Sequence, residues 1–255
     1  MTAPRFFYPD PIGLDVTIEL PETLSHHAIR VLRLKHRTPI VLFDGKQGQY
    51  SATLILEGKK AQARIHAFEH RNVELPGHLT LAQALVTADK MDWIIEKAVE
   101  AGVHTFIPVA ARRSVVNLGA ERQDKKMRHW EKIIEAASAQ CGRNQLMQLT
   151  KPQTLATLLA GAGSPPDDTS AGLAAHPGLT LVCHPDARHT LRDLLGPATN
   201  PITLLIGPEG GWSDEELAQA DQAGAQRVRF GKRVLRTETA GLAMVSAISA
   251  LQGWE

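Results

Sequence analysis

The feature that most constrains this chain is an apolar run joined directly to a glycine-rich loop. Ile202–Ile206 predicts a buried strand, and Gly207–Gly211 follows it without a break. Ser213 and Glu216 then have the spacing of a capping box, which predicts that a helix begins at this point. Strand, glycine loop and helix N-terminus in this order are typical of a phosphate-binding turn.

The charges around this loop argue against a phosphate ligand. Four acidic residues surround the helix start, namely Glu209, Asp214, Glu215 and Glu216. No Lys-Ser or Lys-Thr pair closes the loop. An acidic loop that a ligand approaches closely is better suited to a neutral or cationic ligand, such as the sulfonium of S-adenosylmethionine. The alternative is a tight strand-to-helix connection that binds nothing.

The first 70 residues predict a small β domain. Its expected strands are Pro39–Phe43, Gln49–Leu56 and Lys60–Ala67. This spacing of strands and turns predicts a small barrel, with Ser25–Leu34 as a helical exception capped by Ser25. Arg71–Leu79 contains a Pro-Gly pair and predicts a linker, so we expect one domain at residues 1–72 and a second at residues 73–255.

From Leu79 onward, strands and helices alternate. The expected strands are Thr80–Leu85, Thr105–Val109, Leu179–Cys183, Ile202–Ile206 and Arg227–Phe230. The expected helices are one capped by Asp89 at its start and by Gly102 at its end, one at about Glu121–Cys141, and one at Ala240–Leu251 capped by Thr237 or Thr239. Such alternation predicts an α/β fold with a parallel sheet and helices on both faces.

Composition excludes several classes of protein. Hydrophobic content of 43% and charged content of 22% are ordinary for a globular protein. There is no apolar run of membrane-spanning length and no signal-peptide segment at the N-terminus, so we expect a cytoplasmic protein with no membrane partner. Cys141 and Cys183 are expected to be reduced core residues, and the 11 histidines show no metal-ligand spacing, which predicts a metal-free protein.

A formal net charge of +1 does not by itself indicate a nucleic-acid partner, but the distribution of charge does. Between Glu22 and Asp44 there are basic residues and no acidic ones, and the same holds between Asp221 and Glu238. Two acid-free basic runs in a near-neutral chain predict local patches that face phosphates. The alternative for each run is a solvated face.

A second motif, GKRVLRTETA, covers Gly231–Ala240 and leads into a C-terminal helix rich in small residues. Together with GPEGG at residues 207–211, it resembles the RsmE family, the 16S ribosomal RNA uridine-N3 methyltransferases of the SPOUT superfamily. Further matching blocks occur in order, at Arg5-Phe6-Phe7, Val31-Leu32-Arg33, Lys90-Met91-Asp92, Glu96–Val103, Arg113-Ser114 and Glu135-Ala136-Ala137. Ala101, Trp212 and Phe230 depart from the family pattern as apolar exchanges.

The resemblance implies an architecture and a substrate. It implies an N-terminal PUA-like β-barrel and a C-terminal SPOUT α/β domain with a deep trefoil knot, which periodicity alone does not reveal. It also implies that S-adenosylmethionine is the cofactor, that the protein is a homodimer, and that the substrate is 16S ribosomal RNA within the small subunit.

The resemblance also implies roles for individual residues. Three strand ends are expected to hold the cofactor, through Cys183, His184, Ile206, Gly207, Pro208, Glu209, Gly210, Gly211, Val234, Leu235 and Thr237. Arg236 and Glu238 are the expected catalytic pair, with Arg236 stabilising the uridine anion and Glu238 taking the proton. RNA contacts are expected at Arg5, Arg30, Arg33 and Arg113.

Alternatives remain at this point. Glu238 has a second interpretation as a carboxylate favoured by the helix dipole, and Arg236 has one as a phosphate contact. The activity has alternatives in ribose 2′-O-methylation by another SPOUT enzyme and in a non-catalytic RNA-binding or assembly protein. A phosphate-binding nucleotide hydrolase is disfavoured by the acidic helix start.

Overall fold

The computed structural model describes residues 3–46, 48–114, 120–160, 178–197, 199 and 201–254. It divides into two compact units. We call residues 1–74 with 135–146 the small unit, and residues 75–134 with 147–255 the large unit. Within the described ranges, no helix has the length and apolar character needed to cross a membrane.

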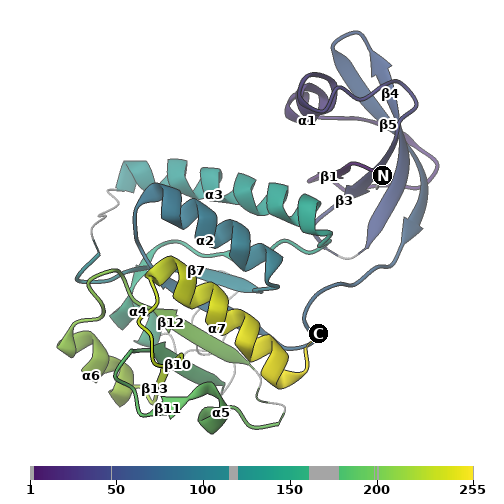
Figure 1. The fold of residues 1–255 in the computed structure, drawn as a ribbon. Helices are drawn as coiled ribbons and strands as arrows, with labels where there is room; N and C mark the ends of the chain where they lie inside the picture. The colour runs from purple at the N-terminus through teal and green to yellow at the C-terminus, as the bar shows by residue number, and fades with distance from the viewer. Residues whose placement is uncertain are drawn as a thin grey trace. The chain divides into compact units, whose positions relative to one another are not determined.

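The small unit is built on a five-stranded sheet in the order β1-β3-β4-β5-β2 (Figure 1). Its strands are β1 (Arg5–Phe7), β2 (Thr17–Glu19), β3 (Pro39–Phe43), β4 (Gln49–Glu57) and β5 (Lys60–Glu69). β1 is parallel to β3, whereas the other pairs are antiparallel. Alternate side chains of these strands, such as Ile40, Leu54 and Ile65, are almost fully buried and form the core. The three strands expected from the sequence are confirmed.

The helix of the small unit begins before the expected cap. α1 spans Glu22–His26 and continues as the π-helical turn η1, His27–Val31, so the prediction that Ser25 caps the helix is wrong. Ser25 is 3% exposed, its hydroxyl donates to the carbonyl of Leu20 at 3.1 Å, and it accepts from the N–H of Ala61 at 3.2 Å. The hydroxyl therefore ties α1 to β5 instead of closing the helix end.

The large unit contains a parallel sheet in the order β11-β13-β10-β12-β6-β7-β8, with β9 also paired to β7. Its strands are β6 (Leu79–Ala84), β7 (Thr105–Ala110), β8 (Gln148–Leu149), β9 (Gln153–Thr154), β10 (Leu179–Cys183), β11 (His189–Thr190), β12 (Ile202–Ile206) and β13 (Gln226–Arg229). β12 lies between β6 and β10, and all five of its residues are buried. The parallel sheet expected from the sequence is confirmed.

Helices cover both faces of this sheet. α2 (Ala88–Glu100) and α7 (Thr237–Gln252) lie together on one face (Figure 1). α4 (Leu155–Ala160) and α6 (Asp214–Gln222) pack on the other face, where their leucines share a core with Ala82, Val182 and Leu205. The remaining helices are α3 (Ala120–Cys141), whose residues from 135 on belong to the small unit, and the short α5 (Leu191–Leu194).

Three further details differ from the sequence predictions, two in the large unit and one at the end of α3 in the small unit. α2 begins at Ala88, so Asp89 lies in its first turn and is not the cap, although Gly102 follows the helix end with a φ of +82° as expected. α7 begins at Thr237 after the N-cap position Arg236, so neither threonine caps it. The expectation of two core cysteines is wrong for Cys141, which ends α3 exposed to solvent.

The capping box at α6 is confirmed. Ser213 Oγ accepts from the N–H of Glu216 at 3.2 Å, and Glu216 Oε2 accepts from the N–H of Ser213 at 2.9 Å. Both side chains are buried, at 5% and 6% exposure. The same carboxylate accepts from the N–H of Arg112 at 2.9 Å through Oε1. Glu216 thus joins the start of α6 to the end of β7.

We predict that Ser213→Ala lowers the free energy of unfolding by about 1 kcal/mol, because the buried N–H of Glu216 loses its acceptor. Urea unfolding followed by circular dichroism measures this change. Ser246→Ala is the matched control, since Ser246 is exposed on α7 and alanine favours the helix. Equal stability of Ser213→Ala and the parent protein would contradict the capping role.

Candidate functional site

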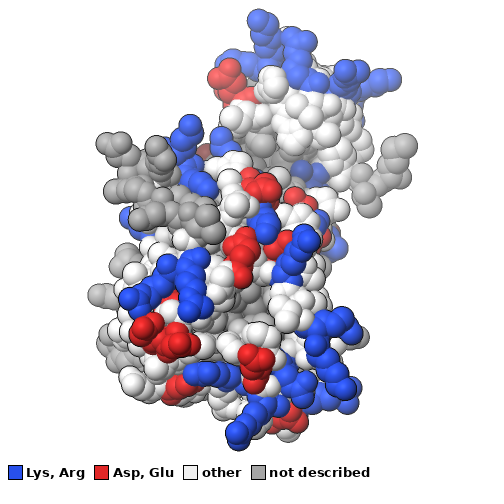
Figure 2. Space-filling view, turned by 60° about the vertical axis from the view of Figure 1, so that its left-hand side comes forward, with Lys and Arg blue, Asp and Glu red and all other residues white. Residues whose placement is uncertain are grey.

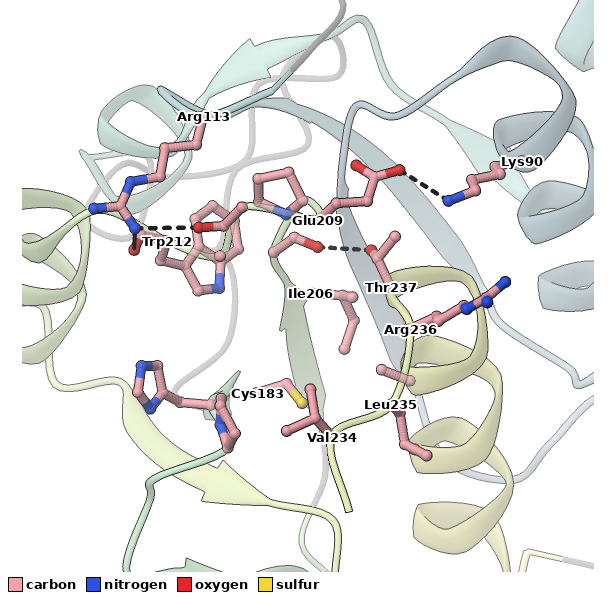
Figure 3. A pocket seen from close by; sticks show the side chains of 17 residues that line it. Lys90, Arg113, Cys183, Ile206, Glu209, Trp212, Val234, Leu235, Arg236 and Thr237 are labelled. Carbon is pink, nitrogen blue, oxygen red and sulfur yellow. Dashed lines mark hydrogen bonds and ion pairs between the residues drawn. The ribbon is translucent and has the colours of Figure 1, made fainter.

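A cavity of about 580 Å³ opens in the large unit where β10 and β12 end and α7 begins (Figure 3). Ligands of open parallel sheets bind at the carboxyl ends of the strands, which is where this cavity lies. The residues that line it come from β10 and its following turn, the loop after β12, the segment before α7 with the start of that helix, the first turn of α2 and the turn after β7: Lys90, Arg113, Cys183, His184, Pro185, Ile206, Gly207, Pro208, Glu209, Gly210, Gly211, Trp212, Val234, Leu235, Arg236, Thr237 and Ala240.

The glycine loop forms one wall of the cavity. Its turn is closed by the N–H of Gly211, which donates to the carbonyl of Pro208 at 2.9 Å, and Gly211 has a φ of +69° that favours glycine. A side chain at Gly207 would place its Cβ 3.1 Å from Nε1 of Trp212. Glycine therefore serves two purposes in this loop, a left-handed conformation and close packing.

Arg113, expected to contact RNA, holds the glycine loop. Its Nη1 donates to the carbonyl of Gly210 at 3.1 Å and to that of Trp212 at 3.3 Å, as Figure 3 shows. The neighbouring Arg112 pairs with Glu215 of α6 at 2.9 Å. The turn after β7 thus fastens both the loop and the start of α6.

Thr237 ties the start of α7 to the same loop. Its hydroxyl donates to the carbonyl of Gly207 at 2.6 Å and accepts from Nε2 of Gln83 at 2.9 Å. Gln83 is fully buried in β6, and Thr237 is 7% exposed. The cavity wall therefore rests on three elements that are distant in sequence, β6, the loop after β12 and α7.

A lysine and two carboxylates lie at one side of the cavity. Nζ of Lys90 is 3.0 Å from Oε1 of Glu209 and 3.4 Å from Oε2 of Glu238. The longer contact is an ion pair without hydrogen-bond geometry, and Oε2 of Glu238 is buried without another partner. The hydrogen bond to Glu209 is the largest cause of a raised pKa at Lys90.

The ionisation of Glu209 follows from competing effects. Burial by itself raises the pKa of the Glu209 carboxyl, but a hydrogen bond from its own N–H and the bond from Lys90 outweigh burial. The pKa therefore lies below the ordinary value of 4.5. The Glu209 carboxyl is therefore ionised at neutral pH and pairs with the ammonium of Lys90.

The opposite wall is largely apolar. Val234 is 80% exposed, an unusual exposure for valine, and Leu235 and Ile206 line the same space (Figure 3). Burial raises the pKa of the Cys183 thiol to about 11, so this sulfur is a neutral thiol and not a nucleophile at neutral pH. His184 is part of the turn after β10, where its N–H donates to the carbonyl of Val228 at 2.9 Å.

The two expected catalytic residues are placed differently. Arg236 lines the cavity from an exposed position before α7, and its guanidinium points away from Cys183 and Ile206 (Figure 3). Glu238 is absent from the cavity lining and lies beside Lys90 instead. Their catalytic roles stay predictions.

The expected RNA-contacting residues of the small unit differ in exposure and in their partners. Arg30 and Arg33 are exposed on and after η1, and Figure 2 shows Lys and Arg side chains together on this unit. Arg5 instead donates to Oε1 of Gln49 and, at 2.6 Å, to Oδ1 of Asn144. Burial is the largest cause that lowers the pKa of its guanidinium. Arg5 therefore organises the interior of the small unit.

Every residue that we expected to hold a cofactor lines this one cavity. Lys90, Trp212 and Ala240 also line the cavity although no cofactor contact was expected of them, and Gln83 behind the wall had no expected role. Lys90 belonged to a matching family block, but no charge pattern connects the start of α2 with a loop more than 100 residues later. Among the described residues, no His, Cys, Asp and Glu side chains are grouped as metal ligands are; the metal-free character stays a prediction.

The chemistry of the cavity fits a ligand with a cationic and an apolar part. Its volume lies in the range of small-molecule sites, roughly 300–1,000 Å³. The Nε1 of Trp212 is buried without a partner behind the glycine wall. A carboxylate, a glycine backbone and exposed aliphatic side chains together suit a sulfonium-bearing nucleoside.

Residues 73–249 match the family described as RNA methyltransferase domain. A ribosomal RNA small subunit methyltransferase E of Bacillus subtilis is 30% identical, with 88% of this chain and 86% of the relative covered, and the enzyme of that name from Synechocystis is 30% identical over 93% of this chain and 74% of its own. The chain belongs to the ribosomal RNA small subunit methyltransferase E family.

Two solved structures agree over nearly the whole chain. A methyltransferase of Legionella pneumophila, in complex with the cofactor SAM, has a TM-score of 0.88 at 31% identity, with 98% of each chain covered. Ribosomal RNA small subunit methyltransferase E of Neisseria gonorrhoeae, bound to S-adenosyl methionine, has a TM-score of 0.86 at 32% identity, also with 98% of each chain covered. The α/β fold with a small sheet and a larger parallel sheet is therefore that of the family.

We predict that Lys90→Met raises the pKa of Glu209. The variant loses the ammonium that stabilises the carboxylate, whereas the burial that destabilises the carboxylate remains. In the parent protein the lowered pKa favours the folded state above about pH 4.5, and this contribution is lost as pH falls through the folded-state pKa. The stability difference between parent and variant should therefore narrow on acidification.

Carboxyl carbon NMR, with the Glu209 signal assigned through Glu209→Gln, measures this pKa. Lys97→Met is the matched control, because Lys97 pairs with Glu96 and Glu100 on the same helix. If Glu209 titrates identically in the parent and in Lys90→Met, the ammonium does not act on that carboxylate.

Proposed function

We propose that this protein methylates N3 of a specific uridine in 16S ribosomal RNA, with S-adenosylmethionine as the methyl donor. The observation that carries the proposal is the cavity at the ends of β10 and β12, which gathers all the expected cofactor residues. Two structural relatives that share 98% coverage with this chain hold that cofactor. Family membership supports ribosomal RNA of the small subunit as the substrate.

The residues present suit this cofactor, which supplies an electrophilic methyl group on a sulfonium when bound. The backbone of Gly207–Gly211 offers polar groups at close approach, and Val234 and Leu235 offer apolar surface for a purine. The ionised Glu209 favours the cationic part. Arg113 and Thr237 hold the loop in the shape that these contacts require.

Arg236 is the residue that we propose for the uridine. N3 of uridine carries a proton and becomes nucleophilic only when the proton leaves, so a guanidinium near the adjacent carbonyl oxygens favours the anion. Its position at the open edge of the cavity supports this role. Since Glu238 lies beside Lys90 and outside the lining, we assign Glu238 a positioning role and propose that solvent takes the proton.

The proposal also covers architecture and partners. It includes a PUA-like barrel at residues 1–72, a SPOUT domain at residues 73–255 with a deep trefoil knot, and a homodimer. We propose that the protein is cytoplasmic and that its substrate is 16S ribosomal RNA within the small subunit. The late strand β12 between two earlier strands supports the knot. The exposed Arg30 and Arg33 support contact of the small unit with RNA phosphates, whereas Arg5 and Arg113 hold protein groups.

The test is methylation of small ribosomal subunits that lack the modification. Incubation with S-adenosylmethionine labelled in its methyl group, followed by digestion of the RNA, should give a single labelled nucleoside, 3-methyluridine. Label on a ribose 2′-oxygen would replace this proposal with the alternative SPOUT activity. Cofactor binding without any transfer to RNA, subunits or precursors would favour a non-catalytic role.

We predict that Arg236→Ala lowers kcat and kcat/KM together by about 100-fold, while the affinity for S-adenosylmethionine changes little, because the guanidinium acts mainly in the transition state. Raising the pH should partly restore the variant, since hydroxide then favours the uridine anion. Steady-state kinetics with subunits and calorimetry with cofactor measure these effects. Arg233→Ala is the control, an exposed arginine three residues earlier. Full recovery of kcat at saturating RNA would make Arg236 a phosphate anchor.

A further inference from the structure

Gln83 is a fully buried polar residue that no expected function includes. It lies near the end of β6, beside Ile206 in the register of β6 and β12, and its side chain points toward α7. Nε2 donates to the carbonyl of Ala84 at 3.1 Å and to Oγ1 of Thr237 at 2.9 Å. Oε1 is buried and has no hydrogen-bond partner.

The hydrogen bonds that link Gln83, Thr237 and Gly207 have only one possible assignment of donors and acceptors. The carbonyl of Ala84 only accepts, so the amide nitrogen of Gln83 must face it, and the same nitrogen then donates to Thr237. A threonine hydroxyl has one proton. With its oxygen accepting from Gln83, that proton goes to the carbonyl of Gly207, 2.6 Å away.

The orphaned oxygen shows that Gln83 is not placed for stability alone. A buried amide oxygen without a partner is unfavourable, and an apolar side chain of similar length avoids the problem. Its nearest surroundings are apolar or small, since a Cβ at Gly241 would lie 3.5 Å from Oε1 and near Leu81 and Ile206. What Gln83 supplies in return is the donor that orients Thr237.

We propose that Gln83 is a positioning residue, which orients the Thr237 hydroxyl and thereby fixes the Gly207 peptide at the entrance of the cofactor loop. The inference rests on the proposed function for its consequence, cofactor affinity, but the ordering of the loop is independent of any ligand. Gly207 needs this anchor because glycine, which lacks a Cβ, has more backbone freedom than other residues, and the following proline removes only part of that freedom.

The anchor acts through the population of the binding-competent loop. When only a fraction of molecules hold the loop in that shape, the apparent dissociation constant rises in inverse proportion to the fraction. Loss of the Thr237 hydroxyl removes the bond to Gly207 altogether. Loss of the Gln83 amide leaves the hydroxyl free to rotate, so its effect is smaller and depends on Thr237.

The experiment compares Gln83→Met, Thr237→Val, Thr237→Ser and the Gln83→Met/Thr237→Val double variant in the full chain. Hydrogen exchange of the peptide covering residues 207–213 reports loop ordering without ligand, and calorimetry reports the affinity for S-adenosylmethionine. Thr239→Val is the matched control, an exposed threonine two residues along α7. Thermal unfolding monitors global stability.

We expect Thr237→Val to speed hydrogen exchange of this peptide and to weaken cofactor binding about tenfold. Gln83→Met should speed exchange to a smaller degree and weaken cofactor binding about threefold, without lowering the melting temperature. Thr237→Ser should restore the parent values, and Gln83→Met should add nothing in the Thr237→Val background, since both act through one bond. Parent-like exchange in Gln83→Met, or additive effects in the double variant, overturns the proposal. If the parent chain binds no S-adenosylmethionine, the proposed function fails, and exchange alone still decides the role of Gln83.

Discussion

The site depends on the placement of β12 between β6 and β10. Hydrogen-bonded on both edges and buried on both faces, this strand has no freedom to shift, and it ends where Gly207 begins. Its register sets Ile206 beside Gln83 and Leu205 beside Ala82 and Val182. The position of the glycine loop is set by this strand end, because a loop is held in a defined place only when the element before it is rigid.

Around that fixed point, the loop is held from three directions. Arg113 holds its carbonyls from the end of β7, Thr237 holds its first peptide from α7, and Lys90 holds its carboxylate from α2. The Thr237 anchor is a neutral hydrogen bond, the Arg113 anchor is a hydrogen bond from a charged donor, and the Lys90 anchor is an ion pair. A glycine loop has high conformational entropy when free, so such anchors are what make a preformed binding site of it.

Much of the candidate site was readable from the sequence because its signals are local. The strand Ile202–Ile206, the capping box of Ser213 with Glu216 and the glycine loop lie within 15 consecutive residues and obey short-range rules. The expected cofactor residues then met in one cavity. The errors at Ser25 and Thr237 concern side chains with two possible partners. Ser25 and Thr237 resemble helix caps in sequence, but each bonds to a backbone group of a distant segment.

The sequence by itself determined the family, the parallel α/β character of the large unit, and the loop that forms the site, because periodicity and turn chemistry act between near neighbours. Only the tertiary structure decided which side chains hold that loop. Gln83 lies 154 residues from Thr237, and Lys90 lies 119 residues from Glu209. Their partners follow from the order of strands in the sheet, and strand order depends on how non-local surfaces bury together, which no local pattern encodes.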